Sequence, residues 1–365
     1  MFVNHTRELH GSEQVMIQTL RICKEQGWRV TMVMPGNRPD GGLAKTIEDE
    51  ADILYLNYKN SGEGLLRTMA IELYNLPAVI RLCRWIRRNH IDCVYSNTTV
   101  TMLGVEAARW THTPHVWHWH ELPTEEFGWS KPTIRFLRYW ASHSSQILFI
   151  SLTQRRMWEE AMGINAIHSA RVIYNPVQTI HPHQTDSPRY IRIGYMGSFM
   201  PRKNIHWLIQ TAARLAKEYP LQLDLYGAKD QNEAKEIQSQ WSDFHSLTVH
   251  EHTTDIESVY ASLDIFVLPS WSETMPLVVL EAMQAGVAVI QTDQSGMTEL
   301  MHDGEECLFV HPNNKESLFQ ALIRCMDPSF RTELAARGQI FATQWMAQNN
   351  YPNEIRSVFN NLLDD

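Results

Sequence analysis

Short β-branched segments alternate with amphipathic helical segments along the whole chain, and this alternation restricts the possible folds more than any other feature. The expected strands of a first series are residues 1–5, 28–34, 53–56, 91–95, 115–120 and 146–151. Those of a second series are residues 191–196, 221–226, 247–250, 265–269, 288–292 and 307–310. Intervening stretches such as 12–26 have apolar residues at helical spacing. Alternating strands and helices form parallel sheets covered by helices on both faces, which predicts an α/β chain with two Rossmann-like halves.

A polar stretch without periodicity, residues 178–188, separates the two series and is expected to be the interdomain linker. The chain has 365 residues, which is enough for two domains. We predict an N-terminal domain over residues 1–177 and a C-terminal domain over residues 178–345. Residues 331–363 are expected to be helical throughout, which is longer than one more strand–helix unit requires. Residues 346–365 are therefore expected to cross back to the N-terminal domain as a helix.

Charge and cysteine content exclude several classes of protein. The net charge of −9 argues against a nucleic-acid partner, which usually requires a basic surface. The acidity lies in the second half, since residues 1–175 have a net charge of +2 and the remainder has −11. Five separated cysteines, without a CxxC pair, favour a reducing, cytoplasmic compartment. No apolar run approaches the ~18 residues of a membrane span, and the start of the sequence lacks the pattern of a signal peptide.

The most informative segment, residues 264–292, follows the order strand, loop, helix, glycine stop and strand. Glu281 stands among apolar residues of the expected helix, where a carboxylate needs hydrogen-bond donors. A ribose diol would supply two such donors, although a solvated or ion-paired carboxylate is the commoner explanation. Glu273 stands in the loop before the helix, where the free N–H groups favour an anion, whether a diphosphate or a capping acid.

A second candidate loop, residues 194–204, follows a strand and opens a helix. Glycine at Gly197 lets the backbone approach a ligand, and the adjacent cations Arg202 and Lys203 could neutralise a pyrophosphate. Loops of this kind are frequent, so the segment is weak evidence when taken alone.

Together these segments resemble the retaining glycosyltransferases of family 4, which have the GT-B fold of two Rossmann-like domains facing across a cleft. Glu273 and Glu281 match the E-x7-E motif of that family, within a P-S-x-x-E and E-A-M-x-x-G-x-x-V-I frame. Gly197 and Lys203 match its G-x5-K phosphate loop, and Gly227 matches the glycine that ends the next strand. The resemblance extends to the first half, where residues 9–13 look like its glycine-containing turn and residues 118–121 like its histidine-bearing strand end.

The resemblance implies a role for each matching residue. Glu281 would hold the ribose, Lys203 would bind the diphosphate, and the backbone amides near Leu277 and Val278 would bind phosphate oxygens. Glu273 would face the donor sugar, and His120 would reach that sugar across the cleft. Gly11 and Ser12 would belong to the loop on the acceptor side.

Two positions depart from the family pattern. Ser198 stands where the phosphate loop usually has arginine directly after the glycine, so Arg202 would have to supply the second phosphate cation. The first-half turn has a single glycine, Gly11, with Ser12 at the place of the second.

The resemblance implies transfer of a sugar, with retention of configuration, from a UDP- or GDP-type donor to a hydroxyl of a glycan, a lipid-linked acceptor or a small molecule. The alternative is a non-catalytic nucleotide-sugar or glycan-binding protein of the same fold. An NAD-linked oxidoreductase is disfavoured because neither half has G-x-G-x-x-G after its first strand. We expect no metal site and no cofactor besides the donor, since the His/Glu cluster of residues 118–121 lacks a third ligand at regular spacing.

Two basic helical stretches of the first half bear on localisation. Arg81, Arg84, Arg87 and Arg88 share one stretch with an apolar stripe, and residues 129–140 form a second basic, aromatic stretch. The simpler interpretation is the solvated outer face of a Rossmann helix. The other is a patch for anionic lipid or an acidic acceptor, which would place the chain at the inner face of a membrane.

Overall fold

The computed structural model describes residues 1–36, 41–61, 64–123, 129–164, 167, 169–181 and 190–363. It divides into two compact units, which we describe separately. Unit 1 comprises Met1–Asn175 and Asn350–Asp365, and unit 2 comprises Pro176–Asn349. The division after Asn175 lies two residues before the expected boundary. Most of the expected linker lies outside the described residues.

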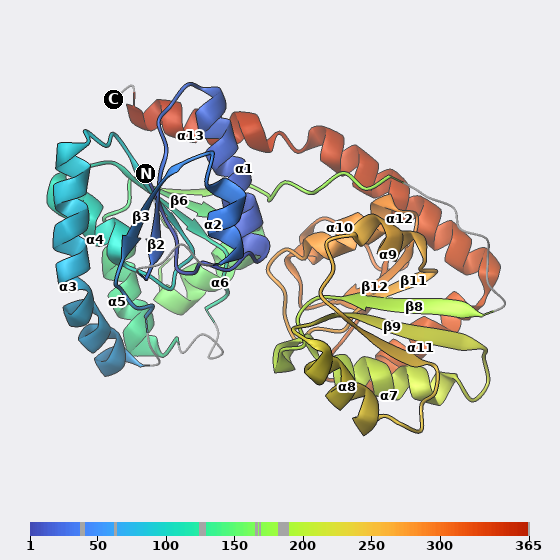
Figure 1. The fold of residues 1–365 in the computed structure, drawn as a ribbon. Coiled ribbons are helices and arrows are strands. Elements are labelled where there is room, and N and C mark those ends of the chain that lie inside the picture. The colour runs from blue at the N-terminus through green and yellow to red at the C-terminus, as the bar shows by residue number, and fades with distance from the viewer. Residues whose placement is uncertain are drawn as a thin grey trace. The chain divides into compact units, whose positions relative to one another are not determined.

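Unit 1 has a parallel seven-stranded sheet of order β3-β2-β1-β4-β5-β6-β7 (Figure 1). Its strands are β1 (Phe2–Val3), β2 (Thr31–Pro35), β3 (Asp52–Leu56), β4 (Val94–Asn97), β5 (His115–Trp119), β6 (Gln146–Phe149) and β7 (Ala170–Val172). Its helices are α1 (Gly11–Glu25), α2 (Gly42–Ile47), α3 (Leu65–Arg88), α4 (Leu103–Thr111), α5 (Lys131–Ala141), α6 (Leu152–Met162) and α13 (Tyr351–Leu363). The central strands β4 and β5 are fully buried, as expected for a sheet covered on both faces.

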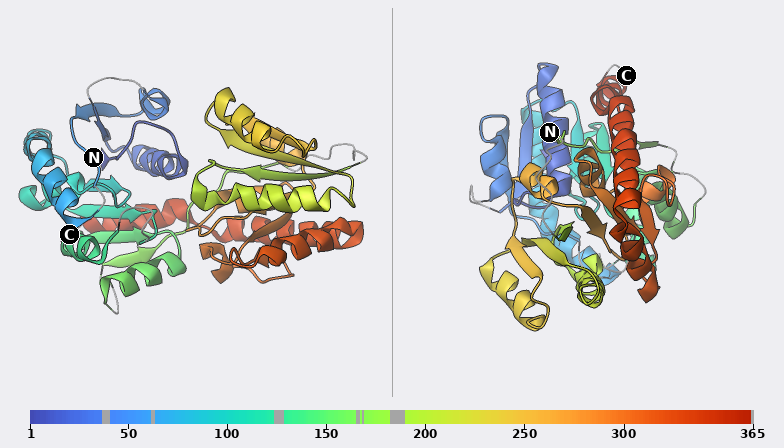
Figure 2. Two further views of the ribbon diagram at one scale, coloured as in Figure 1. Left: turned by 90° about the horizontal axis from the view of Figure 1, so that it is seen from below. Right: turned by 90° about the vertical axis from the view of Figure 1, so that its right-hand side faces the viewer.

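Unit 2 has a parallel six-stranded sheet of order β10-β9-β8-β11-β12-β13. Its strands are β8 (Ile191–Met196), β9 (Leu221–Ala228), β10 (Leu247–Glu251), β11 (Ile265–Leu268), β12 (Ala288–Thr292) and β13 (Leu308–Val310). Its α-helices are α7 (Ile205–Leu215), α8 (Gln231–Gln240), α9 (Ile256–Ala261), α10 (Leu277–Gln284), α11 (Lys315–Met326) and α12 (Pro328–Gln348). Two 3-10 turns, η2 (Pro201–Lys203) and η3 (Gly296–Glu299), follow β8 and β12. Helices lie on both faces of the sheet (Figure 2).

The strand order reverses direction once in each sheet, between β1 and β4 in unit 1 and between β8 and β11 in unit 2. Open parallel sheets bind ligands outside the carboxyl ends of their strands at such a reversal. The two Rossmann-like sheets and their parallel pairing confirm the predicted fold class. A ligand site is therefore expected at the loops that follow β1, β4, β8 and β11.

The C-terminal helical segment differs from the sequence prediction, which had one helix over residues 331–363. It consists of two helices, because α12 ends at Gln348 and α13 begins at Tyr351. Pro352 explains the break, since it has no N–H to donate to the carbonyl of Gln348 and its ring would clash with that carbonyl in a continuous helix, but it fits the first turn of a new helix. The returning segment thus begins at Asn350, four residues later than expected.

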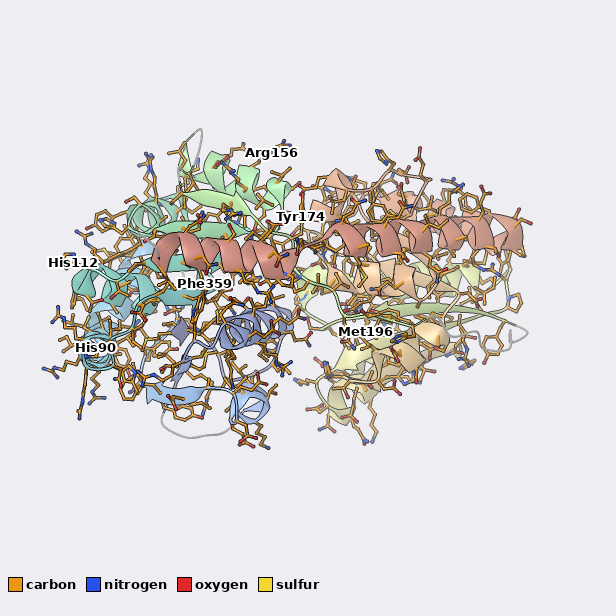
Figure 3. All side chains as sticks on the ribbon, turned by 90° about the horizontal axis from the view of Figure 1, so that it is seen from above. His90, His112, Arg156, Tyr174, Met196 and Phe359 are labelled. Atoms are coloured by element: carbon orange, nitrogen blue, oxygen red, sulfur yellow. The ribbon has the colours of Figure 1, made fainter. Side chains whose placement is uncertain are left out.

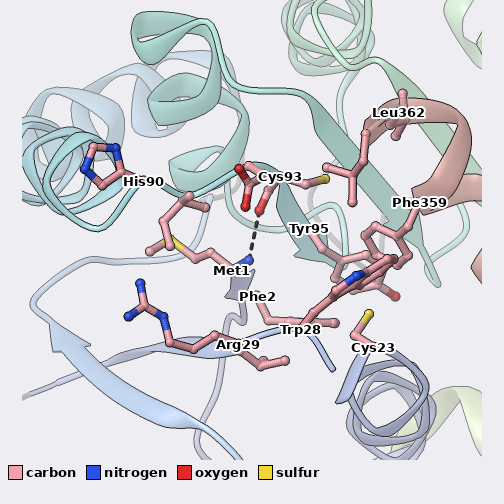
Figure 4. A pocket seen from close by; sticks show the side chains of 14 residues that line it. Met1, Phe2, Cys23, Trp28, Arg29, His90, Cys93, Tyr95, Phe359 and Leu362 are labelled. Atoms are coloured by element: carbon pink, nitrogen blue, oxygen red, sulfur yellow. Dashed lines mark hydrogen bonds between the residues drawn. The ribbon is translucent and has the colours of Figure 1, made fainter. Parts of the chain in front are cut away.

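Helix α13 completes unit 1 by packing against α1. The hydroxyl groups of Tyr351 and Thr19 are 2.6 Å apart in the core, and Arg356 donates a hydrogen bond to Glu25. Phe359 packs edge-on against Trp28, with 5.8 Å between ring centroids. Phe359 also lines a pocket at the amino ends of β1 and β4, where the Met1 amino group donates to the carbonyl of Cys93 at 2.8 Å (Figure 4).

No helix in the described ranges combines the length and the apolar character needed to cross a membrane.

We expect Phe359→Ala to lower the stability of unit 1 by about 3 to 5 kcal/mol, because it leaves a cavity where a buried aromatic ring packs. Urea unfolding followed by Trp fluorescence measures this change. Asn360→Ala, on the exposed side of the same helix, is the matched control and should change stability by less than about 0.5 kcal/mol. Equal effects of the two substitutions would show that α13 does not contribute to the core.

Candidate functional site

Two glycines bring the loop after β8 into direct backbone contact with the end of β9. Gly197 has φ +146° and Gly227 has φ +135°, conformations that side chains rarely adopt. The Gly197 amide donates to the carbonyl of Tyr226 at 3.0 Å. A Cβ atom on Gly227 would lie 2.0 Å from the Gly197 carbonyl oxygen, so no side chain fits there without moving this loop. Both predicted glycines therefore shape the carboxyl edge of this sheet.

The loop after β8 continues into η2, which presents two cations to a buried carboxylate. The Lys203 ammonium lies 2.5 Å from Oε1 of Glu273, and the Arg202 guanidinium lies 3.4 Å from its Oε2. The Ser270 hydroxyl donates to the same Oε1 at 2.5 Å. The backbone of Glu273 is fixed as well, since its amide donates to Gln294 and its carbonyl accepts from Gly296. The structure thus joins Glu273, Arg202 and Lys203 into one cluster, which spacing alone did not indicate.

The two neighbouring cations determine whether Glu273 is ionised. Burial acts to raise the pKa of this carboxyl, but Lys203 and Arg202 outweigh burial and hold the pKa below its usual range. Glu273 is therefore an anion at neutral pH, with a cation on each oxygen. The Lys203 side chain is 14% exposed and that of Arg202 is 27% exposed, so the cluster still borders solvent at the strand ends.

The Ser198 side chain cannot supply the positive charge of the arginine that the family pattern has at this position. The carbonyl oxygen of Ser198 accepts a hydrogen bond from the Tyr195 hydroxyl at 2.8 Å, which fixes the course of the loop. Arg202 is the second cation that the structure places beside Lys203, and both approach the same carboxylate.

Helix α10 carries the second acid of the pair. Leu277 and Val278 form its first turn, where backbone N–H groups have no acceptor within the helix. Glu281 lies one turn further on and accepts a hydrogen bond from the Tyr260 hydroxyl at 2.8 Å. Burial raises the pKa of Glu281, and the Tyr260 hydrogen bond partly opposes this shift. Oε2 of Glu281 is thus occupied within unit 2.

Tyr260 belongs to α9, 21 residues before Glu281, and was not predicted as a site residue. Its ring is fully buried, and its hydroxyl also lies 3.3 Å from the Val278 carbonyl. A tyrosine in a helix with apolar neighbours has no spacing signal that distinguishes it from a core residue, so only the structure could assign this contact.

In unit 1, Gly11 and Ser12 begin α1 at the carboxyl edge of the sheet. A Cβ atom on Gly11 would meet no atom within 4 Å. Ser12 donates to Oε2 of Glu13, and the same oxygen accepts from the His10 amide in a capping box. Asn97, at the end of β4, donates to Oε1 of the fully buried Glu13 at 3.3 Å.

The histidine-bearing end of β5 lies at the same edge. The rings of His118 and His120 are 4.2 Å apart, and the Tyr95 hydroxyl lies 2.5 Å from Nδ1 of His118. Nε2 of His120 is buried and has no hydrogen-bond partner among the described residues. Burial, with a smaller contribution from His5, lowers the pKa of His120 to about 3, so its ring is neutral at pH 7.

Glu121 follows as a second buried acid of unit 1. Its Oε2 accepts hydrogen bonds from both the amide and the hydroxyl of Thr99, each at 2.9 Å. Burial raises the pKa of Glu121. Glu13, Asn97, Thr99 and Glu121 were not predicted as site residues. The sequence did hold a local signal for each acid, since Glu13 stands next to Ser12 after Gly11 and Glu121 stands next to His120 after β5.

We expect the His120 ring to stay neutral when the pH falls from 7 to 5, because protonation would place a charge in a buried site. The folded-state pKa is depressed, so this histidine contributes stability above the unfolded pKa of about 6.5, and that contribution is lost on acidification. NMR of the chain labelled at histidine measures the titration, with the chain unfolded in urea as the reference. A His120 midpoint near the unfolded value would contradict the buried geometry.

Comparisons with known proteins agree with this description of the two units. Residues 9–180 match the model described as Glycosyltransferase Family 4, and residues 190–327 match the model described as Glycosyl transferases group 1. An uncharacterized glycosyltransferase of Haemophilus influenzae is 23% identical over 332 residues, which are 88% of each chain. The O-antigen chain mannosyltransferase B of Escherichia coli is 31% identical over 165 residues, and the match spans only 42% of that relative.

Among solved structures, HepE of Anabaena in complex with UDP-glucose has a TM-score of 0.79 at 20% identity, with 99% of this chain and 98% of that chain covered. The sucrose-phosphate synthase of Thermosynechococcus elongatus also has a TM-score of 0.79, at 15% identity, with 100% and 99% covered. Both halves of the chain match glycosyltransferase models, and the solved structures share its fold over nearly the whole chain, so the chain is a glycosyltransferase of the GT-B fold.

Proposed function

We propose that the chain transfers a sugar from a nucleotide-diphosphate-sugar donor of the UDP or GDP type to an acceptor hydroxyl, with retention of configuration. The observation that carries the proposal is the cluster of Lys203 and Arg202 on Glu273, beside the carboxyl ends of β8 and β11. Two cations at the reversal of strand order suit a diphosphate. The solved complexes of HepE with UDP and UDP-glucose support a donor of this class.

Each part of the donor is assigned to groups within unit 2. Lys203 and Arg202 bind the diphosphate, and the first-turn amides of Leu277 and Val278 bind phosphate oxygens. Glu281 binds the ribose through Oε1, because Oε2 already accepts from Tyr260. Gly197 and Gly227 allow the backbone to approach the donor closely.

The proposed reaction forms a bond between the acceptor oxygen and the anomeric carbon while the bond from that carbon to the phosphate oxygen breaks. The diphosphate leaves with the bonding electrons, and one of its oxygens takes the acceptor proton. Lys203 and Arg202 stabilise the departing charge. Glu273 stabilises positive charge that develops on the sugar ring, and the neutral ring of His120 offers a hydrogen bond to a sugar hydroxyl. The loop that begins at Gly11 and Ser12 is assigned to the acceptor.

The acceptor class is a glycan or a lipid-linked glycan. Relatives named for O-antigen chain, lipopolysaccharide core and capsular polysaccharide biosynthesis support this assignment.

Glu281→Ala should weaken binding of the donor by about 2 to 3 kcal/mol, because a charged acceptor of the ribose hydroxyls is lost. Tyr260→Phe should weaken it by about 1 kcal/mol, since the carboxylate is then no longer held in place. Isothermal titration with UDP-glucose and GDP-mannose measures both effects. Tyr219→Phe, elsewhere in unit 2, is the matched control, and unchanged affinity in Glu281→Ala would refute the ribose assignment.

Turnover should survive EDTA, because side-chain cations and helix amides neutralise the leaving diphosphate in this proposal. Release of nucleotide diphosphate in the presence of acceptor is the readout. A complete loss on chelation that a divalent ion restores would show that the cluster does not suffice.

The stereochemical outcome tests the retaining mechanism. An α-linked donor should give an α-linked product, which NMR couplings of the product identify. Glu273→Gln should lower kcat more than it raises KM, because its charge matters most when the sugar ring becomes positive. A β-linked product would refute retention. Donor binding without any transfer would instead fit a sugar-nucleotide-binding protein.

A further inference from the structure

The outer side of α3 carries a stripe of exposed apolar side chains. Leu66, Met69, Leu73, Leu76 and Ile80 repeat at intervals of three and four residues, so they lie along one side of the helix. Leu66 is 83% exposed and Leu73 is 74% exposed, although both could have been polar at no cost to the core. The opposite side packs on the sheet through residues such as Val79 and Leu82.

The same side of the helix continues with arginine where the apolar stripe ends. Arg84 and Arg87 follow Ile80 at the same spacing, and Arg81 and Arg88 flank them. The 24 residues of α3 span about 36 Å, so the apolar half and the basic half lie end to end on one long surface.

Helices α4 and α5 extend this surface. Arg87 of α3 donates to the carbonyl of Trp110 at the end of α4, and Arg109 lies over the Tyr139 ring of α5, 5.3 Å from its centroid. His90 and His112, which follow α3 and α4, lie at the same end of unit 1 (Figure 3). Of the fifteen large apolar side chains exposed in the described part of the chain, eight lie on these three helices. They are Leu66, Met69, Leu73, Tyr74, Leu76, Ile80, Trp110 and Tyr139.

All exposed charges on the three helices have the same sign. Five cations lie on α3, one on α4 and three on α5. They are Arg67, Arg81, Arg84, Arg87, Arg88, Arg109, Lys131, Arg135 and Arg138. Every residue of the three helices is described, and their two acids, Glu72 and Glu106, have buried carboxylates. Burial raises the pKa of Glu72 to about 8 and that of Glu106 to about 7, which reduces their negative charge at neutral pH.

This segregation of charge is unusual for a chain with a net charge of −9. A second copy of the chain explains less of this surface, because a two-fold contact that pairs the two apolar stripes does not need the cations, and one that pairs the two basic halves brings like charges together. An anionic lipid surface fits both properties, since leucine side chains enter the acyl boundary while arginines contact the headgroups.

We propose that the outer face of α3, α4 and α5 binds an anionic lipid surface, with the apolar half of α3 inserted and its arginines at the headgroups. Binding needs both the exposed leucines and the charge. It does not depend on the donor site, so the proposal stands or falls separately from the proposed reaction.

Cosedimentation of the full chain with lipid vesicles tests the proposal. The chain should bind vesicles of phosphatidylcholine with phosphatidylglycerol and should not bind phosphatidylcholine alone. Leu66→Ser/Leu73→Ser and Arg84→Glu/Arg88→Glu should each weaken binding by about tenfold or more. High salt should weaken binding of the wild type and should have less effect on the charge-reversed variant.

Two control variants keep the number and type of substitutions but lie elsewhere. Leu152→Ser/Ile340→Ser removes exposed apolar side chains from α6 and α12, and Lys217→Glu/Lys235→Glu reverses exposed charges of unit 2. Both should bind vesicles like the wild type, and circular dichroism checks that all variants are folded. The proposal is wrong if the wild type ignores anionic vesicles or if the α3 variants bind as well as their controls. It is equally wrong if Leu66→Ser/Leu73→Ser still binds vesicles like the wild type and loses only self-association, as measured by sedimentation velocity.

Discussion

A buried carboxylate with a cation on each oxygen holds the carboxyl edge of the second sheet together. Taking Glu273 out of water costs free energy unless its charge is compensated, and Lys203, Arg202 and Ser270 provide that compensation. The backbone of Glu273 bonds at the same time to residues that follow β12. One residue, through its side chain and its backbone, thus fixes the relative positions of the loops after β8, β11 and β12.

The same cluster bears on the proposed binding of an anionic donor at these loops. Glu273 already holds Lys203 and Arg202 in place, so in the proposed function a diphosphate would not have to order them. Unit 1 uses a related device at its own carboxyl edge, where Glu13 and Glu121 accept several donors from neighbouring loops.

Sequence patterns were sufficient for the fold class because strand–helix alternation has a local signal, although the short edge strand β7 (Ala170–Val172) was not among the expected strands. β8 and β12 occupy the predicted ranges. Gly197 and Gly227 lie at strand ends, Glu273 lies in the loop before α10, and Glu281 lies within α10, as expected. The pairing of Glu273 with Lys203 was not predictable in this way, because 70 residues separate them and only the sheet brings them together. Tyr260 was missed because a tyrosine among apolar helix neighbours cannot be told from a core residue by its spacing. The break at Asn349 was missed because apolar spacing continues across it, although Pro352 was a local signal.

Calorimetric titration of UDP and of uridine into wild-type chain and Lys203→Ala tests the central claim most directly. If the cations on Glu273 form the diphosphate site, the substitution should weaken UDP by about tenfold or more and leave uridine unchanged. Lys235→Ala, an exposed lysine on α8, should leave both affinities unchanged. Equal affinity of Lys203→Ala and wild type for UDP would contradict the account, since the diphosphate would then be bound elsewhere.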